Sequence, residues 1–245
     1  MTLEDLENWV LRFLQTTYDD GNWSQPEIQQ YLNDEQKRLH LHIAGKDEDF
    51  FWVISSPISE VQGQNLYTLP TNLHKMLRLE RIQGGQATPQ NPTCLAVVDK
   101  NFSQVQRARG SAWPNAIPGT AFLPMTYQMH GQAQFELLPI PQSSLTNSLQ
   151  AVYVFKPDDM VDPSDVPFQV THGPGGVGKD NLSEFHDMIA MGAIVRALEH
   201  EESYPQADRM QKRYDERMME LERYLAQINV QQPRFVHVTD ETLWG

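Results

Sequence analysis

The chain has 245 residues, of which 40% are apolar, so it can bury a sizeable core in one large or two modest domains. The net charge of −13 argues against general affinity for nucleic acid, because phosphate binding needs clustered lysines and arginines. DNA could still pass along an acidic wall without adhering to it. Cys94 is the only cysteine, which excludes an intramolecular disulfide. The acidic first residues predict no secretory signal, and no apolar run is long enough to predict a membrane span.

Two helices are expected at the N-terminal end. In the first, Leu3, Leu6 and Val10 recur at helical spacing, and the turn-forming residues 19–22 end it. The second starts at the capping box formed by residues 24–27, which has a proline in its first turn, and extends to residue 45.

Short apolar or alternating runs, separated by Gly, Pro, Asn and Ser, occupy the middle of the chain. They cover residues 51–54, 66–69, 76–82, 95–98, 127–130, 135–138 and 149–155. This pattern predicts a compact antiparallel β unit with hairpins. The Pro- and Gly-rich residues 156–182 are interpreted as a long exposed linker.

Two further helices are predicted after residue 183. The first is apolar almost all round from Phe185, which is typical of a buried helix. Tyr204 and Pro205 interrupt it, and the apolar residues of 207–228 then recur every three or four positions, as in a helix packed along a partner. The side chains of this last helix that we expect at contacts between subunits are Tyr214, Met218, Leu221, Tyr224 and Leu225.

The expected fold class is α+β. The N-terminal helices (1–48) and the C-terminal helical hairpin (181–229) form a four-helix-type bundle. A small antiparallel β domain with its linker (49–180) is inserted between them, and an extended C-terminal arm (230–245) follows. This arm is unusually apolar for a chain end, so it packs either on its own domain or on another subunit.

The segment Gly173–Lys179 has the spacing of a phosphate-binding loop, between a possible strand at residues 168–171 and a helix. Asp180 replaces the Ser or Thr that would hold magnesium, and no further parallel strands are predicted downstream. A Gly-rich linker is the favoured interpretation.

No pattern predicts catalysis, a cofactor or a metal site. His40 and His42 point to different faces of their helix, and no spacing of Cys, His and carboxylates completes a ligand set. Glu35, Asp158 and Asp159 can be nominated for acid–base chemistry, but nothing singles them out. We therefore expect a protein that is not an enzyme.

Several motifs resemble those of phage head-to-tail adaptor proteins, the connectors that bind beneath the portal ring. The family's "Y-x-L-P … L-R-L" start of the β unit resembles residues 67–70 followed by 76–81. Its "Y … G … L-x-P-x-P" strand resembles residues 127–141, and "L-x-Y-x-x-x-P" resembles the stretch around Tyr153 and Pro157. Trp23 and the residues up to 33 resemble the start of the family's second helix. The insertion at 110–124 and the loop at 173–180 depart from the family pattern.

This resemblance implies a structural virion protein at the head–tail junction, assembled in the host cytoplasm. It implies a ring, usually of twelve subunits, that contacts the portal protein and a tail or nozzle protein, with no membrane partner. Genomic DNA would pass through its channel without specific binding. The residues of the arm implied to contact the portal are Arg234, Phe235, Val236, Val238, Leu243 and Trp244. A nucleotide-binding enzyme using Gly173–Lys179 and a non-viral oligomeric scaffold remain as alternatives.

Overall fold

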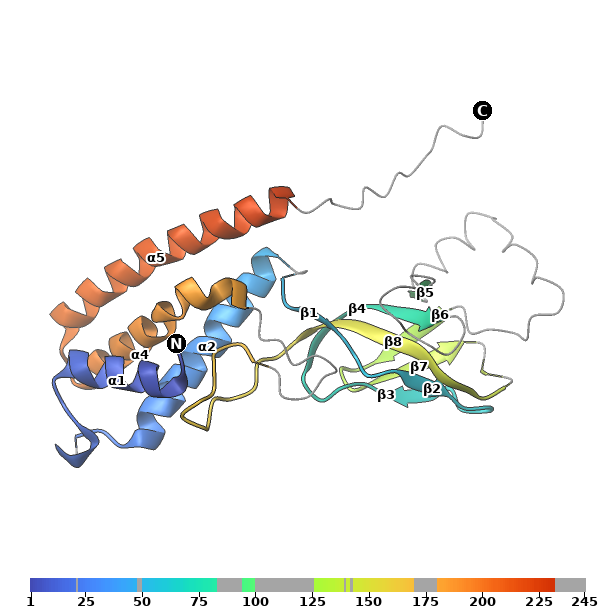
Figure 1. Ribbon diagram of the computed structural model, residues 1–245, viewed down its shortest axis with the longest axis horizontal. Coiled ribbons are helices and arrows are strands. Elements are labelled where there is room, and N and C mark those ends of the chain that lie inside the picture. The colour runs from blue at the N-terminus through green and yellow to red at the C-terminus, as the bar shows by residue number, and fades with distance from the viewer. Residues whose placement is uncertain are drawn as a thin grey trace. The chain divides into compact units, whose positions relative to one another are not determined.

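The computed structural model describes residues 1–20, 22–47, 50–82, 94–99, 126–138, 140–141, 143–169 and 180–231. Over these residues the protein has the expected α+β class, with α-helices at both ends of the chain and β-strands between them (Figure 1). The described part divides into two compact units. One contains Met1–Asp5 and Gln36–Leu182, and the other contains Leu6–Glu35 and Ser183–Gly245. We call them the sheet unit and the helical unit.

The two N-terminal helices begin at side-chain caps. In α1 (Leu3–Leu14), the backbone N–H of Thr2 donates to Asp5 Oδ2 over 2.9 Å, and the N–H of Asp5 donates to Thr2 Oγ1 over 3.3 Å. In α2 (Gln25–Lys46), the N–H of Ser24 donates to Glu27 Oε2 over 2.9 Å, which confirms the predicted capping box. A short 3₁₀ turn, η1 (Tyr18–Asp20), lies between these helices.

The C-terminal helices also match the prediction. After a 3₁₀ turn, η2 (Asp180–Phe185), come α4 (Asp187–His200) and α5 (Tyr204–Gln231), which lie side by side (Figure 1). Most of α4 is buried, as expected for a helix that is apolar nearly all round. The break predicted at Tyr204 is the point at which α5 begins.

The strands form one mixed sheet in the order β1-β8-β4-β5-β6-β7-β3, with β2 also paired to β8. Their bounds are β1 Trp52–Ile54, β2 Ile58–Glu60, β3 Leu66–Thr68, β4 Leu73–Ile82, β5 Cys94–Asp99, β6 Thr126–His130, β7 Gln134–Leu138 and β8 Leu145–Phe155. Each of the seven predicted runs contains a strand. β2 was not predicted, because it is only three residues long and lies directly after Pro57.

One strand pair differs from the expected antiparallel arrangement. β5 and β6 run parallel, with Val98 opposite Thr126 and Asp99 opposite Tyr127, whereas the other pairs in the described sheet are antiparallel. A parallel pair requires a connection of roughly a dozen residues or more, and the segment between these two strands is long enough. The sequence pattern located both strands but could not give their direction.

Strand β8 lies at the centre of the sheet unit. From Ser148 to Phe155 every residue is buried, so both faces of this stretch are covered. The rings of Phe51, Phe155 and Phe168 form an aromatic cluster beside it, with centroids 5.7 Å apart for Phe51 and Phe155 and 5.5 Å apart for Phe51 and Phe168.

The prediction of an exposed linker is wrong in part: within residues 156–169, residues 161–164 are exposed but other positions are packed. Met160 and Phe168 are buried there. The backbone N–H of Phe168 donates to Gln36 Oε1 over 2.9 Å, and Gln36 Nε2 donates to the carbonyl oxygen of Asp158 over 2.9 Å. These two bonds fasten the segment to α2. Proline and glycine content indicated irregular backbone correctly, but irregular backbone is not necessarily exposed.

Candidate functional sites

A buried polar junction joins the helices of the helical unit. Glu35 of α2 is fully buried, and the Tyr214 hydroxyl of α5 donates to its Oε1 over 2.7 Å. Arg196 of α4 donates to Asp34 Oδ2 over 2.9 Å and places a second nitrogen 3.8 Å from Glu35 Oε2. Gly192 of α4 faces the Glu35 side chain, so that a Cβ at this position would collide with it. We call this group of residues the Glu35 junction.

Two further contacts bind the ends of these helices. Trp23 is buried, and its indole N–H donates to Glu201 Oε1, just after α4, over 3.0 Å. Arg217 of α5 forms ion pairs with Asp187 over 3.0 Å and with Glu220 over 2.6 Å. The hydrogen bond from Arg217 to Glu220, followed by its bond to Asp187, raises the pKa of the guanidinium. Helices from both ends of the sequence are therefore cross-linked by polar side chains.

The five residues predicted at subunit contacts divide into two groups. Tyr214, Leu221 and Leu225 are buried in the described chain, whereas Met218 and Tyr224 are half-buried. The Tyr224 ring packs against Phe185, with centroids 5.3 Å apart. Met219, which lies beyond the apolar stripe, is 53% exposed. The subunit contact itself stays a prediction.

The predicted portal-binding residues, from Arg234 to Trp244, lie outside the described residues. So do the insertion at 110–124 and the loop at 173–179. The strand suggested before that loop is wrong where it is described, because Phe168 lies in a turn with φ of 61° and Gln169 is in no strand. At these two positions the strand that a phosphate-binding loop would follow is therefore not formed.

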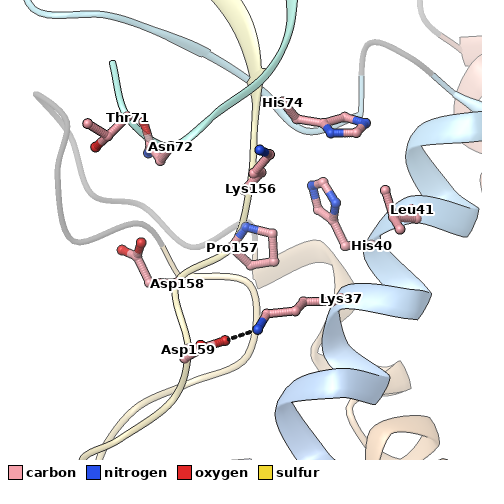
Figure 2. A pocket seen from close by; sticks show the side chains of 10 residues that line it. All are labelled: Lys37, His40, Leu41, Thr71, Asn72, His74, Lys156, Pro157, Asp158 and Asp159. Atoms are coloured by element: carbon pink, nitrogen blue, oxygen red, sulfur yellow. Dashed lines mark ion pairs between the residues drawn. The ribbon is translucent and has the colours of Figure 1, made fainter. Parts of the chain in front are cut away.

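A pocket of about 440 Å³ lies in the sheet unit (Figure 2). Three segments line it: residues 37–41 of α2, residues 71–74 at the start of β4, and residues 156–159 after β8. The backbone N–H of Lys156 donates to the Asn72 carbonyl over 2.6 Å, which holds the second and third segments together. An ion pair of 2.6 Å between Lys37 and Asp159 joins the third segment to α2. We call this cavity the His40 pocket.

His40 is the most perturbed titratable group of this pocket. Only 1% of it is exposed, and its ring packs on Phe51 and Phe155 with centroid distances of 4.4 and 5.8 Å. Burial lowers the pKa of His40 to about 4, with a smaller contribution from His74, whose ring centroid lies 5.9 Å away. Burial, followed by the charges of Lys156 and Lys75, lowers the pKa of His74 as well. Both imidazoles are therefore neutral at pH 7.

Sequence reasoning missed this pocket. His40 and His42 were only excluded as a ligand pair, and Asp158 and Asp159 were nominated only as generic carboxylates. The pocket-forming residues come from three segments far apart in the chain, and no spacing links them. The sequence does contain a partial signal, because Met160 and Phe168 are large apolar residues in a Pro-rich stretch. Their presence could have indicated that this segment packs against the rest of the protein.

Within the described residues, no three histidine, cysteine or carboxylate side chains gather closely enough to hold a metal ion. Likewise, none of the helices there is both long and apolar enough to cross a membrane.

The family model described as SU10 adaptor protein matches residues 1–237 of the chain. No curated protein matches it. The match covers nearly the whole chain, including both groups of helices and all the described strands.

Proposed function

We propose a role for this chain from the premise that it belongs to the SU10 adaptor protein family, a family of phage head-to-tail adaptors. It is thus a structural adaptor and a virion component. Our proposal is that copies of the chain, twelve in number, form a ring between the portal and the tail of a tailed phage. The ring lines the channel through which the genome passes. The match of the family model over residues 1–237 is the observation that carries this proposal.

Within this ring we propose that the four helices form one bundle and that the strands are a domain inserted into it. The proposed ranges are residues 1–48 and 181–229 for the bundle, 49–180 for the β domain with its linker, and 230–245 for the arm. The Glu35 junction supports this arrangement, because it connects α2, α4 and α5 through buried side chains. A hydrogen bond of 3.2 Å from Gln25 to Glu7 adds α1 to the group.

Contacts between subunits are proposed on α5. Tyr214, Leu221 and Leu225 are buried within their own chain, so the proposed contact with a neighbour is made through the half-buried Met218 and the exposed Met219. Contacts that pair two different patches on identical subunits close into rings when the rotation permits. The charge of −13 fits a channel wall that repels DNA and lets it slide.

The ring contact can be tested with one charged substitution. Met219→Asp introduces a carboxylate at the proposed contact and should shift the protein toward monomer in sedimentation velocity. Val161→Asp is the matched control, because Val161 is 67% exposed and belongs to the sheet unit rather than to α5. Equal assembly of the two variants would contradict a subunit contact at Met219.

The portal contact is proposed for the C-terminal arm, Arg234–Gly245, whose apolar residues would order on the portal and bury surface there. A chain that ends at Pro233 should keep the melting temperature of the full protein. It should no longer co-sediment with purified portal rings. Unchanged co-sedimentation of the truncated chain would contradict a portal contact by the arm. It would not bear on the formation of the ring.

A further inference from the structure

The His40 pocket contains two buried polar atoms without a hydrogen-bond partner among the described residues: Nε2 of His40 and Nδ2 of Asn72. Buried polar groups are nearly always paired, so each atom requires a partner. The Asn72 amide is oriented by the Tyr153 hydroxyl, which donates to Asn72 Oδ1 over 3.0 Å. Its NH₂ group, on a residue that lines the pocket, is therefore left as a buried donor without an acceptor among the described residues.

The charges around these atoms favour an anion. Lys156 lines the pocket, and its ammonium group makes no ion pair with any described residue. After the larger effect of burial, the charges of Lys156 and Lys75 also lower the pKa of His74, so cationic groups lie near this end of the pocket. In the view of Figure 2, Lys156 is drawn between Asn72 and His74. An anion placed here would meet a cation and a neutral donor together.

The other end of the pocket limits the charge that a ligand can carry. Lys37 is already paired with Asp159, and Asp158 adds a second carboxylate to the lining. A dianionic phosphate would be repelled by these groups, and the described residues that line the pocket include no arginine to bind it through two parallel hydrogen bonds. A carboxylate carries one charge and needs only one cation and one or two donors.

The volume of the pocket is too large to be filled by a single bridging water molecule. At about 440 Å³ the cavity is within the range of small-molecule sites, about 300–1,000 Å³, and far exceeds the roughly 30 Å³ of one water. We propose that the His40 pocket is a binding site for a carboxylate group, held by Lys156 and the Asn72 amide. The carboxylate belongs either to a small organic acid or to an acidic side chain of a protein. This inference does not depend on the proposed ring.

The test uses the full chain and NMR of the Asn72 side-chain amide. The probes, at matched ionic strength, are butyrate, a blocked peptide with a single glutamate, and inorganic phosphate. Butyrate should shift the Asn72 NH₂ signals saturably and more tightly than phosphate does. Saturation by butyrate but not by the peptide identifies a small organic acid as the source. Tighter binding of the peptide identifies an acidic protein side chain.

Two variants and one control make the test decisive. Lys156→Met should weaken butyrate binding at least tenfold, and because Lys156 is exposed it should not unfold the protein. Asn72→Asp keeps the acceptor for Tyr153 but replaces the donor with a negative charge, so it should abolish binding. In this variant binding is followed by the imidazole signals of His74, which also lines the pocket. Lys212→Met on α5 should bind as wild type does. Failure of butyrate to saturate, tighter binding of phosphate, or unchanged binding by Lys156→Met would overturn the proposal.

Discussion

The Tyr214 hydroxyl donates a 2.7 Å hydrogen bond to the Glu35 carboxylate, although these residues are separated by 179 positions in the sequence. Both are buried, at 2% and 0% exposure. The bond therefore connects a helix from the start of the chain to one from its end, in an environment where a lost partner is costly. In a structural adaptor every copy must hold the same geometry. The Tyr214–Glu35 hydrogen bond contributes to this by fixing the two helices relative to each other.

Removal of this hydroxyl should destabilise the protein. Tyr214→Phe deletes the donor and keeps the ring, so we expect a loss of about 1–3 kcal/mol in the free energy of unfolding. Denaturant titration measures it. Tyr204→Phe is the control on the same helix, because Tyr204 is 59% exposed and its substitution should stay within about 0.5 kcal/mol. Similar stability of the two variants would show that the bond does not contribute.

Gly192 provides an independent test of the same junction. Alanine normally stabilises a helix relative to glycine by about 0.5–1 kcal/mol. At Gly192, however, the new Cβ would collide with the buried Glu35 side chain, so Gly192→Ala should instead destabilise by about 1–3 kcal/mol.

The matched control for this substitution is Gly45→Ala in α2. A Cβ at Gly45 meets nothing within 4 Å, so the ordinary helix preference should apply and the variant should be slightly more stable. Opposite signs for the two variants in thermal unfolding are the expected outcome. A stabilising effect of Gly192→Ala would contradict the close contact between α4 and the Glu35 side chain.

The buried imidazole of His40 should make stability depend on pH. Its pKa is lowered from 6.5 to about 4 in the folded protein, so the unfolded chain binds a proton over a pH range in which the folded chain does not. The neutral His40 contributes about 3 kcal/mol to the free energy of unfolding. This contribution is complete above about pH 7 and is lost as pH falls from about 6.5 to about 4. His40→Phe should flatten the dependence of unfolding free energy on pH in this window. An identical slope in wild type and variant would contradict a neutral buried His40.

The pair of Glu60 and Arg81 should behave as a coupled unit. A nitrogen of Arg81 lies 3.1 Å from a Glu60 carboxylate oxygen, and both side chains are buried. Burial raises the pKa of Glu60 and lowers that of Arg81, and each partner's charge opposes the shift of the other. Glu60→Gln leaves the guanidinium buried without its counter-charge, which costs about 3–5 kcal/mol.

A double-mutant cycle measures this coupling. Adding Arg81→Met to Glu60→Gln removes the orphaned charge, so the double variant should recover part of the loss. Additive losses from the two single substitutions would indicate that the pair does not interact.

The sequence predicted the regular elements well, because each depends on local pattern. The capping box at residues 24–27 and the break at Tyr204 placed helix starts correctly. Apolar runs located seven of the described strands. These signals act over a few residues, and tertiary structure did not override them.

Long-range pairing escaped prediction for a physical reason. Glu60 is buried because Arg81, on another strand, neutralises it, and nothing near Glu60 in the sequence reveals that partner. The same holds for Glu35, which was nominated as a generic carboxylate and proves to be fixed by Tyr214. The three segments of the His40 pocket meet only after β4 and β8 pair. Periodicity records which face of an element is buried but not what covers it.

The central claim is that this adaptor works as a ring on a portal. The most direct measurement is electron microscopy of the purified full-length protein mixed with purified portal rings. The account predicts closed rings of the protein, twelve-fold in averaged top views, stacked coaxially on the portal. Portal particles without added density, together with a protein that stays monomeric at the same concentration, would contradict it.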